Sequence, residues 1–125
     1  MNLLNREAIL SAQDRKFEEV DVPEWGGTVR VATIPAADQD RWVAKFSAHG
    51  EADQAMFRAG YVALCCVDGE GARIFKDEDT RALGAKSASA IRRVFDVAAK
   101  LNGLTEGAEL EKNFDAGPSA GSSSE

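Results

Sequence analysis

The stretch VDVPEWGGTVRV, residues 20–31, constrains the fold more than any other part of this 125-residue chain. Two short runs with alternating apolar residues flank a five-residue turn, Pro23 to Gly27, and this pattern predicts a β-hairpin. The turn carries Trp25 at its centre, where small polar residues are usual. A tryptophan at a hairpin tip either packs onto the core as a lid or contacts a partner as an exposed anchor. We favour the lid and keep the anchor as the alternative.

The segments around the hairpin read as helices. A short helix capped by Asn5 precedes it and ends near residues 13–14, with Leu4 and Ile9 spaced as a hydrophobic staple. Apolar periodicity and capping residues predict the later elements. These are a helix from Pro35 to about His49, a helix from about Ala52 to Cys66, a short extended run from Ala72 to Phe75, a helix from Asp77 to Gly84, a helix from Ser87 to Leu101 and a weak helix from Glu106 to Phe114.

Two of these helices have informative patterns. The helix that ends at Cys66 is apolar on nearly all sides, which is typical of a buried central helix. Gly60 within it costs about 1 kcal/mol relative to alanine and permits close packing of a neighbour. The helix that follows Ser87 is the clearest amphipathic element, because its apolar residues recur at intervals of three and four. Asn102 and Gly103 are expected to end it.

The elements together predict an α+β, mostly helical fold. An N-terminal helix and a β-hairpin are followed by a compact bundle of about four to five helices, with a small turn and strand inserted after Cys66. The length fits one globular domain, residues 1–114. Residues 115–125 are rich in glycine and serine, end in an acidic residue, and are predicted to form a disordered tail.

Charge and hydropathy narrow the range of partners. The net charge is −6, and the longest runs of consecutive cationic residues are two pairs, Arg15-Lys16 and Arg92-Arg93. A phosphate backbone or an anionic membrane requires a basic footprint, so we expect neither nucleic acid nor membrane as a partner. No apolar run is long enough to span a bilayer, and the first residues lack a secretory signal, which favours the cytoplasm.

The sequence contains no recognisable motif for a catalytic site or a metal site. His49 is the only histidine and has no nucleophile pattern near it. The stretch from Gly84 to Ser87 does not match a phosphate-binding loop, because Ala85 stands at the position before the lysine where that motif requires glycine. The acidic stretch from Asp68 to Asp79 fails as a calcium loop. Cys65 and Cys66 are adjacent and read as two buried thiols. We therefore expect a non-enzyme with no cofactor and no metal.

Apolar side chains are the remaining candidates for binding. If the chain binds an amphipathic helix in a groove, five residues are the candidate contacts. They are Trp25, Met56, Phe57, Tyr61 and Phe95. For each of them, packing inside the core is the alternative interpretation.

Five stretches of the sequence carry a family resemblance. They are LLNREAIL (residues 3–10), VPEWGGTVRV (22–31), CVDGEGARIF (66–75), the segment from Asp79 to Ser87 with its ALGAKS, and EKNF (111–114). Taken together, they resemble the tail assembly chaperone family of long-tailed, siphophage-type bacteriophages and prophages. The resemblance covers about residues 3–114, and the PEWGG loop is its most specific part.

The resemblance implies a non-enzymatic function in the cytoplasm of the infected cell. Members of this family are thought to coat the aggregation-prone tape measure protein, keep it soluble and help tail tube subunits polymerise around it. They are absent from the mature virion. The family often makes a longer form by translational frameshifting, so the partners implied are the tape measure protein, the major tail tube protein, that longer form and further copies of the chain. Pro118 is present here, but the arginine and aromatic segment that often follows in the family is missing.

Three other hypotheses fit the sequence less well. A minor tail or connector protein would be found in purified virions. A small enzyme that uses Trp25 and scattered carboxylates would require a metal or a ligand. An unrelated protein-interaction module would lack a gene neighbourhood of tail tube and tape measure genes.

Overall fold

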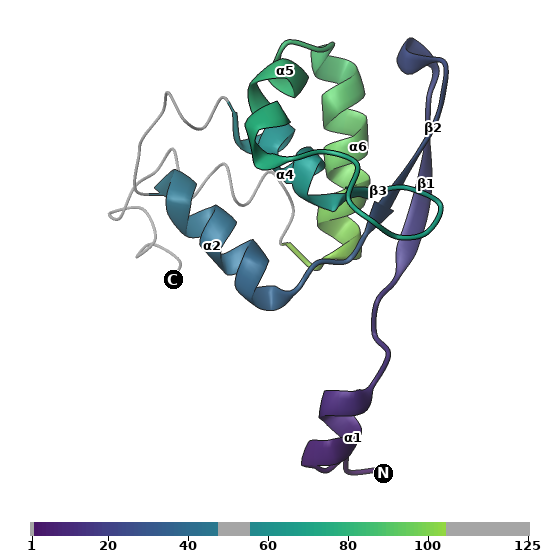
Figure 1. Ribbon diagram of the computed structural model, residues 1–125, viewed down its shortest axis with the longest axis vertical. Coiled ribbons are helices and arrows are strands. Elements are labelled where there is room, and N and C mark those ends of the chain that lie inside the picture. The colour runs from purple at the N-terminus through teal and green to yellow at the C-terminus, as the bar shows by residue number, and fades with distance from the viewer. Residues whose placement is uncertain (1, 48–55, 105–125) are drawn as a thin grey trace, which may run out of the picture.

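The computed structural model describes residues 2–47 and 56–104, and the fold is α+β and mostly helical, with one three-stranded antiparallel sheet (Figure 1). The elements in chain order are α1 (Arg6–Ser11), β1 (Phe17–Val22), the 3₁₀ turn η1 (Pro23–Trp25), β2 (Gly27–Ala32), α2 (Ala36–Ser47), α4 (Phe57–Cys65), β3 (Cys66–Val67), the 3₁₀ turn η2 (Asp77–Asp79), α5 (Thr80–Gly84) and α6 (Ala88–Leu101).

The predicted hairpin is confirmed. Strands β1 and β2 pair antiparallel, with Val20 opposite Val29 and Val22 opposite Gly27. The tip is a single 3₁₀ turn that starts at Pro23, and Gly26 closes it in the left-handed conformation with φ 79°. Glycine is the residue that adopts this conformation without steric cost, which explains the first glycine after Trp25.

The third strand was not predicted. We expected Cys66 to end a helix, but it leaves the helix with an extended backbone and pairs with Val31. The predicted extended run from Ala72 to Phe75 is not a separate strand either, because it contributes one bridge, between Arg73 and Val67. The pairing with β2 decides the conformation here, since a short apolar run alone does not distinguish helix from strand.

The core lies between the sheet and the helices. Helix α6 packs across β1 and β2, and α4 packs against α6 and α5. Seven of the nine α4 residues are buried, which confirms α4 as the central helix. Three aromatic rings form the middle of the core, with centroids 6.1 Å apart for Phe57 and Phe95 and 5.5 Å apart for Tyr61 and Phe95. Both pairs meet edge to face, the arrangement that aromatic quadrupoles favour.

The helix ends follow local capping chemistry. The side chain of Asn5 accepts a hydrogen bond of 2.9 Å from the Ala8 backbone N–H, as predicted, but α1 ends at Ser11, earlier than expected, because Ala12 is extended. Ser87 caps α6 as predicted, and Gly103 follows its end with φ 67°.

The predicted helix from Asp77 to Gly84 consists of two shorter pieces, η2 and α5. Lys76, instead of Asp77, occupies the N-cap position of η2, and its backbone N–H donates 2.8 Å to the carboxylate of Asp79. Four expectations lie outside the described residues. They are the end of the second helix at His49, the start of the next helix at Ala52, the helix over 106–114 and the tail over 115–125.

Candidate functional site

The N-terminal arm, which we define as residues 2–11, contains four of the six exposed large hydrophobic residues in the described part of the chain. None of the α1 residues is buried. The exposed fractions are 83% for Leu3, 62% for Leu4, 57% for Ile9 and 68% for Leu10. Figure 1 shows α1 standing clear of the other elements, at the opposite end of the hairpin from η1. The staple predicted between Leu4 and Ile9 therefore leaves more than half of each side chain exposed. Large apolar groups that gather at one exposed place indicate a contact surface.

The residues after the arm are tied to the core. The backbone of Lys16 donates to the Thr33 hydroxyl at 3.0 Å and accepts from the Thr33 N–H at 2.9 Å. Arg15 donates 2.7 Å to the Gly71 carbonyl. Two guanidinium groups lie over the ring of Phe17, with the Cζ atom of Arg15 at 5.1 Å and that of Arg30 at 4.4 Å from the ring centroid. The direction in which the arm leaves the core is therefore fixed at residues 15–17.

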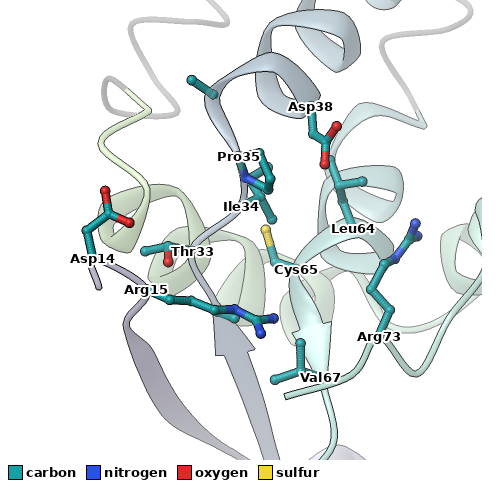
Figure 2. Close-up of a pocket in the computed structure, with 12 residues that line it drawn as sticks. Asp14, Arg15, Thr33, Ile34, Pro35, Asp38, Leu64, Cys65, Val67 and Arg73 are labelled. Carbon is teal, nitrogen blue, oxygen red and sulfur yellow. The ribbon is translucent and has the colours of Figure 1, made fainter. Parts of the chain in front are cut away.

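A cavity of about 590 Å³ opens where the arm leaves the core (Figure 2). We name it the base pocket. Figure 2 shows residues from the arm's connection, the loop that follows β2, the end of α4, β3 and the loop after it around this one space. The residues that line it are Asp14, Arg15, Ala32, Thr33, Ile34, Pro35, Ala36, Asp38, Leu64, Cys65, Val67 and Arg73.

The base pocket combines apolar walls with a charged rim. The half-buried side chains of Ile34 and Leu64 supply two of its apolar walls. Two cations, Arg15 and Arg73, and two carboxylates, Asp14 and Asp38, line it as well. Mostly apolar walls with a few polar groups are typical of a binding pocket.

One side chain holds the wall of the base pocket in place. The Asn102 carboxamide, just after α6, accepts 2.7 Å from the Ile34 N–H. Its amino group donates to the carbonyls of Ala32 at 3.3 Å and Ala98 at 3.0 Å. The sequence identified Asn102 only as a helix stop, whereas the structure gives it this second role between β2, the loop that follows β2, and α6.

Three of the five predicted contact residues belong to the core. The exposed fractions are 4% for Phe57, 0% for Tyr61 and 2% for Phe95. The Tyr61 hydroxyl donates 2.5 Å to the Gln39 side chain, and burial raises its pKa far above the ordinary value. These rings therefore lie inside the core, as the alternative interpretation described, and they line neither of the two cavities described here.

Trp25 and Met56 lie nearer the surface. Both are partly buried and pack against the core, and the Met56 methyl group approaches Gly84. Trp25 thus takes the place that the lid interpretation gave it. Any partner contact through Trp25 or Met56 stays a prediction.

The tip of the hairpin is attached to α6 by an ion pair. The Glu24 carboxylate accepts from the Arg93 guanidinium at 2.5 and 3.2 Å and from the Ser89 hydroxyl at 3.1 Å. The hydrogen bonds from Arg93 lower the pKa of Glu24 to about 2. This two-bond pair fixes the loop that carries Trp25, and sequence reasoning missed it because the partners are 69 positions apart.

A second, basic hollow of about 420 Å³ lies beside the turn between α5 and α6. Arg58, Lys86 and Arg92 line it, together with Gly84. The hydroxyl of Ser87 at this turn accepts from a backbone N–H of its own helix, Ala90, at 3.4 Å. The residues that failed as a phosphate loop thus serve as a helix cap here.

The acidic stretch that failed as a calcium loop contains an ordinary turn. The Asp68 carboxylate accepts from the backbone N–H groups of Glu70 at 2.8 Å and Ala72 at 3.0 Å, and these bonds lower its pKa. Over residues 2–47 and 56–104, no three metal-ligating side chains gather in a way that could hold an ion. Within the same ranges, no helix has the length and apolar character needed to cross a bilayer.

Comparison of the chain with known protein families, with curated proteins and with solved structures finds no match.

Proposed function

We propose that this chain is a non-enzymatic assembly chaperone, which binds a phage tape measure protein, keeps it soluble and promotes assembly of the tail tube around it. The proposal combines the family resemblance of the sequence with one structural observation, the N-terminal arm. The arm presents Leu3, Leu4, Ile9 and Leu10 to solvent. A chaperone for an amphipathic helical client requires exposed apolar side chains of this kind.

Two further properties support the proposal. The net charge of −6 keeps a protein with an exposed apolar arm soluble, because like-charged copies repel each other. The chain just after the arm is held by the Lys16–Thr33 and Arg15–Gly71 hydrogen bonds, so the arm and its apolar residues extend from one fixed place on the core. A localised surface loses less conformational entropy on binding than an unanchored segment does.

The partners and location belong to the same proposal. The client is the tape measure protein, and the major tail tube protein and a longer, frameshifted form of the chain are further partners. The chain acts in the cytoplasm of the infected host cell and leaves before the virion is complete. Mass spectrometry of purified virions should therefore not find it; a stoichiometric amount there would instead indicate a minor tail or connector protein.

Co-expression with a tape measure fragment tests the client. The chain should raise the soluble fraction of the fragment, and the two should be recovered together when either is tagged. The double variant Ile9→Ser/Leu10→Ser should lose both effects, because it removes two of the exposed apolar groups. Gln13→Ser, a polar change next to the arm, is the matched control and should retain them. A fragment that stays insoluble and is not recovered with the wild-type chain would contradict the proposal.

A further inference from the structure

The N-terminal arm and the base pocket complement each other. The arm supplies four exposed apolar side chains, and the pocket supplies apolar walls next to the place where the arm leaves the core. We propose that two copies of this chain exchange arms, so that the arm of each copy occupies the base pocket of the other. The inference concerns the chain in the absence of a client, and a client that binds the arms would have to displace them from the pockets.

The position of the pocket favours exchange between two copies. Asp14 and Arg15 line the pocket and also connect the arm to β1. If a twofold axis between the two arms relates the two copies, the arms lie antiparallel to each other. The free end of each arm then lies beside the base of the other arm, which is where the pocket opens (Figure 2). A twofold interface of this type is closed and uses the same surface on both copies.

Residues 12–14, which connect the arm to the core, make it unfavourable for an arm to fold back into the pocket of its own chain. The side chain of Arg15 and the backbone of Lys16 are both hydrogen-bonded to the core, so the chain would have to reverse direction within residues 12–14. These three residues include neither glycine nor proline, and Ala12 is extended with φ −65° and ψ 139°. Tight reversals depend on glycine, proline, asparagine or aspartate, of which only Asp14 is present.

The charges of the two surfaces also match. The arm carries one acid and one base, Glu7 and Arg6, which contact each other at 3.4 Å in the exposed arm. In the pocket lining, Arg73 already pairs with Asp77 and Asp38 already pairs with Arg41. Arg15 and Asp14 lie at the base of the arm, where they would face Glu7 and Arg6 of the other copy. Opposite charges at the rim of an interface orient the two surfaces and exclude other arrangements.

The first experiment measures the mass of the full chain alone by light scattering during size-exclusion chromatography. The monomer is 13.4 kDa, so the exchanged dimer is expected at 2 × 13.4 = 26.8 kDa. Ile9→Ser/Leu10→Ser should shift the mass to the monomer, with its thermal unfolding transition retained because α1 buries nothing in its own core. Gln13→Ser should stay a dimer. A wild-type chain that is monomeric at all concentrations, or that forms masses above the dimer, overturns the proposal.

The second experiment separates exchange from folding back. Leu10→Cys and Ala36→Cys are made on separate chains, so that a link between these two positions can form only between copies. Ala36 is chosen because it is an exposed residue of the pocket lining. The two chains are mixed, equilibrated and oxidised, and the linked peptides are identified by mass spectrometry. Exchange predicts a disulfide between residue 10 of one chain and residue 36 of the other, and none when Lys86→Cys in the basic hollow replaces Ala36→Cys. If the residue 10–36 link forms only when both cysteines are on one chain, the arm folds back and the proposal is wrong.

Discussion

The indole of Trp42 lies directly against the Cα of Gly60. A Cβ atom built at residue 60 would lie 1.8 Å from Cζ2 and 2.2 Å from Cη2 of that ring. Trp42 is buried, and its Nε1–H donates 3.4 Å to the Phe57 carbonyl, so this contact joins α2 to α4. Glycine inside a helix costs about 1 kcal/mol relative to alanine. The space it leaves for the indole explains its presence and confirms the close packing predicted from the sequence.

Gly60→Ala should destabilise the fold by about 2–3 kcal/mol, although alanine is the better helix former, because the indole has to move in a filled core. Urea unfolding followed by circular dichroism measures the change. The matched control is Gly69→Ala, since a Cβ at Gly69 meets nothing within 4 Å. It should change the free energy of unfolding by less than about 0.5 kcal/mol. A Gly60→Ala variant as stable as the wild type would show that Trp42 does not pack as described.

The two glycines after Trp25 should respond differently to the same substitution. Gly26 has φ 79°, whereas Gly27 has an ordinary backbone, and a Cβ at either position meets nothing within 4 Å. Gly26→Ala should therefore cost about 1–2 kcal/mol of stability, the penalty of a left-handed conformation for a residue with a Cβ. Gly27→Ala should be close to neutral. The same urea titration compares them, and equal losses would contradict the backbone conformation of the turn.

The ion pair between Glu24 and Arg93 should make the free energy of unfolding depend on pH in the acidic range. The pKa of Glu24 is about 2 in the folded state against 4.5 ordinarily. A lowered pKa means that the contribution is present above about pH 4.5 and is lost as the pH falls from 4.5 towards 2. Glu24→Gln should therefore destabilise the protein at pH 7 and have a much smaller effect at pH 2.5. In an Arg93→Gln background the substitution should show no such difference, and a cost that is equal at both pH values would contradict the pair.

The two cysteines should resist thiol reagents until the protein unfolds. Cys65 and Cys66 are fully buried, and burial raises the pKa of each thiol to about 12. Both thiols are therefore protonated at pH 8, and the reactive form is the thiolate. Ellman's reagent at pH 8 should label the native chain at least tenfold more slowly than Ser11→Cys, an exposed control thiol, and should label both cysteines at once in 6 M guanidinium chloride. Fast labelling of the native wild type would contradict their burial.

Local patterns predicted the elements whose structure is decided locally. The hairpin follows from alternating residues on both sides of Pro23 and Gly27, and α6 follows from the Ser87 cap and its apolar spacing. The α+β, mostly helical fold could be predicted because these signals agree with one another. The central position of α4 could be predicted as well, since only a buried helix is apolar on nearly all sides.

The features that could not be predicted depend on contacts between residues that lie far apart in the sequence. Strand β3 depends on the pairing of Cys66 with Val31, 35 positions away, and the apolar run before it is compatible with helix. The base pocket unites Arg15, Ile34 and Leu64 from three separate segments. The exposed arm could not be recognised either, because Leu4 and Ile9 have the same apolar character whether they are buried or exposed. Burial depends on neighbours that a single segment does not specify.

Trp25→Ala should separate the lid from the anchor. Trp25 is partly buried and packs against the core, so its removal should cost about 2 kcal/mol, less than the 3–5 kcal/mol of a fully buried tryptophan. Trp25→Phe keeps an aromatic ring and should retain most of the stability that Trp25→Ala loses. Urea unfolding of both variants is measured beside capture of a tape measure fragment at a temperature where both are folded. A lid predicts lost stability, with capture retained by the folded variant; unchanged stability with lost capture would identify Trp25 as a partner anchor instead.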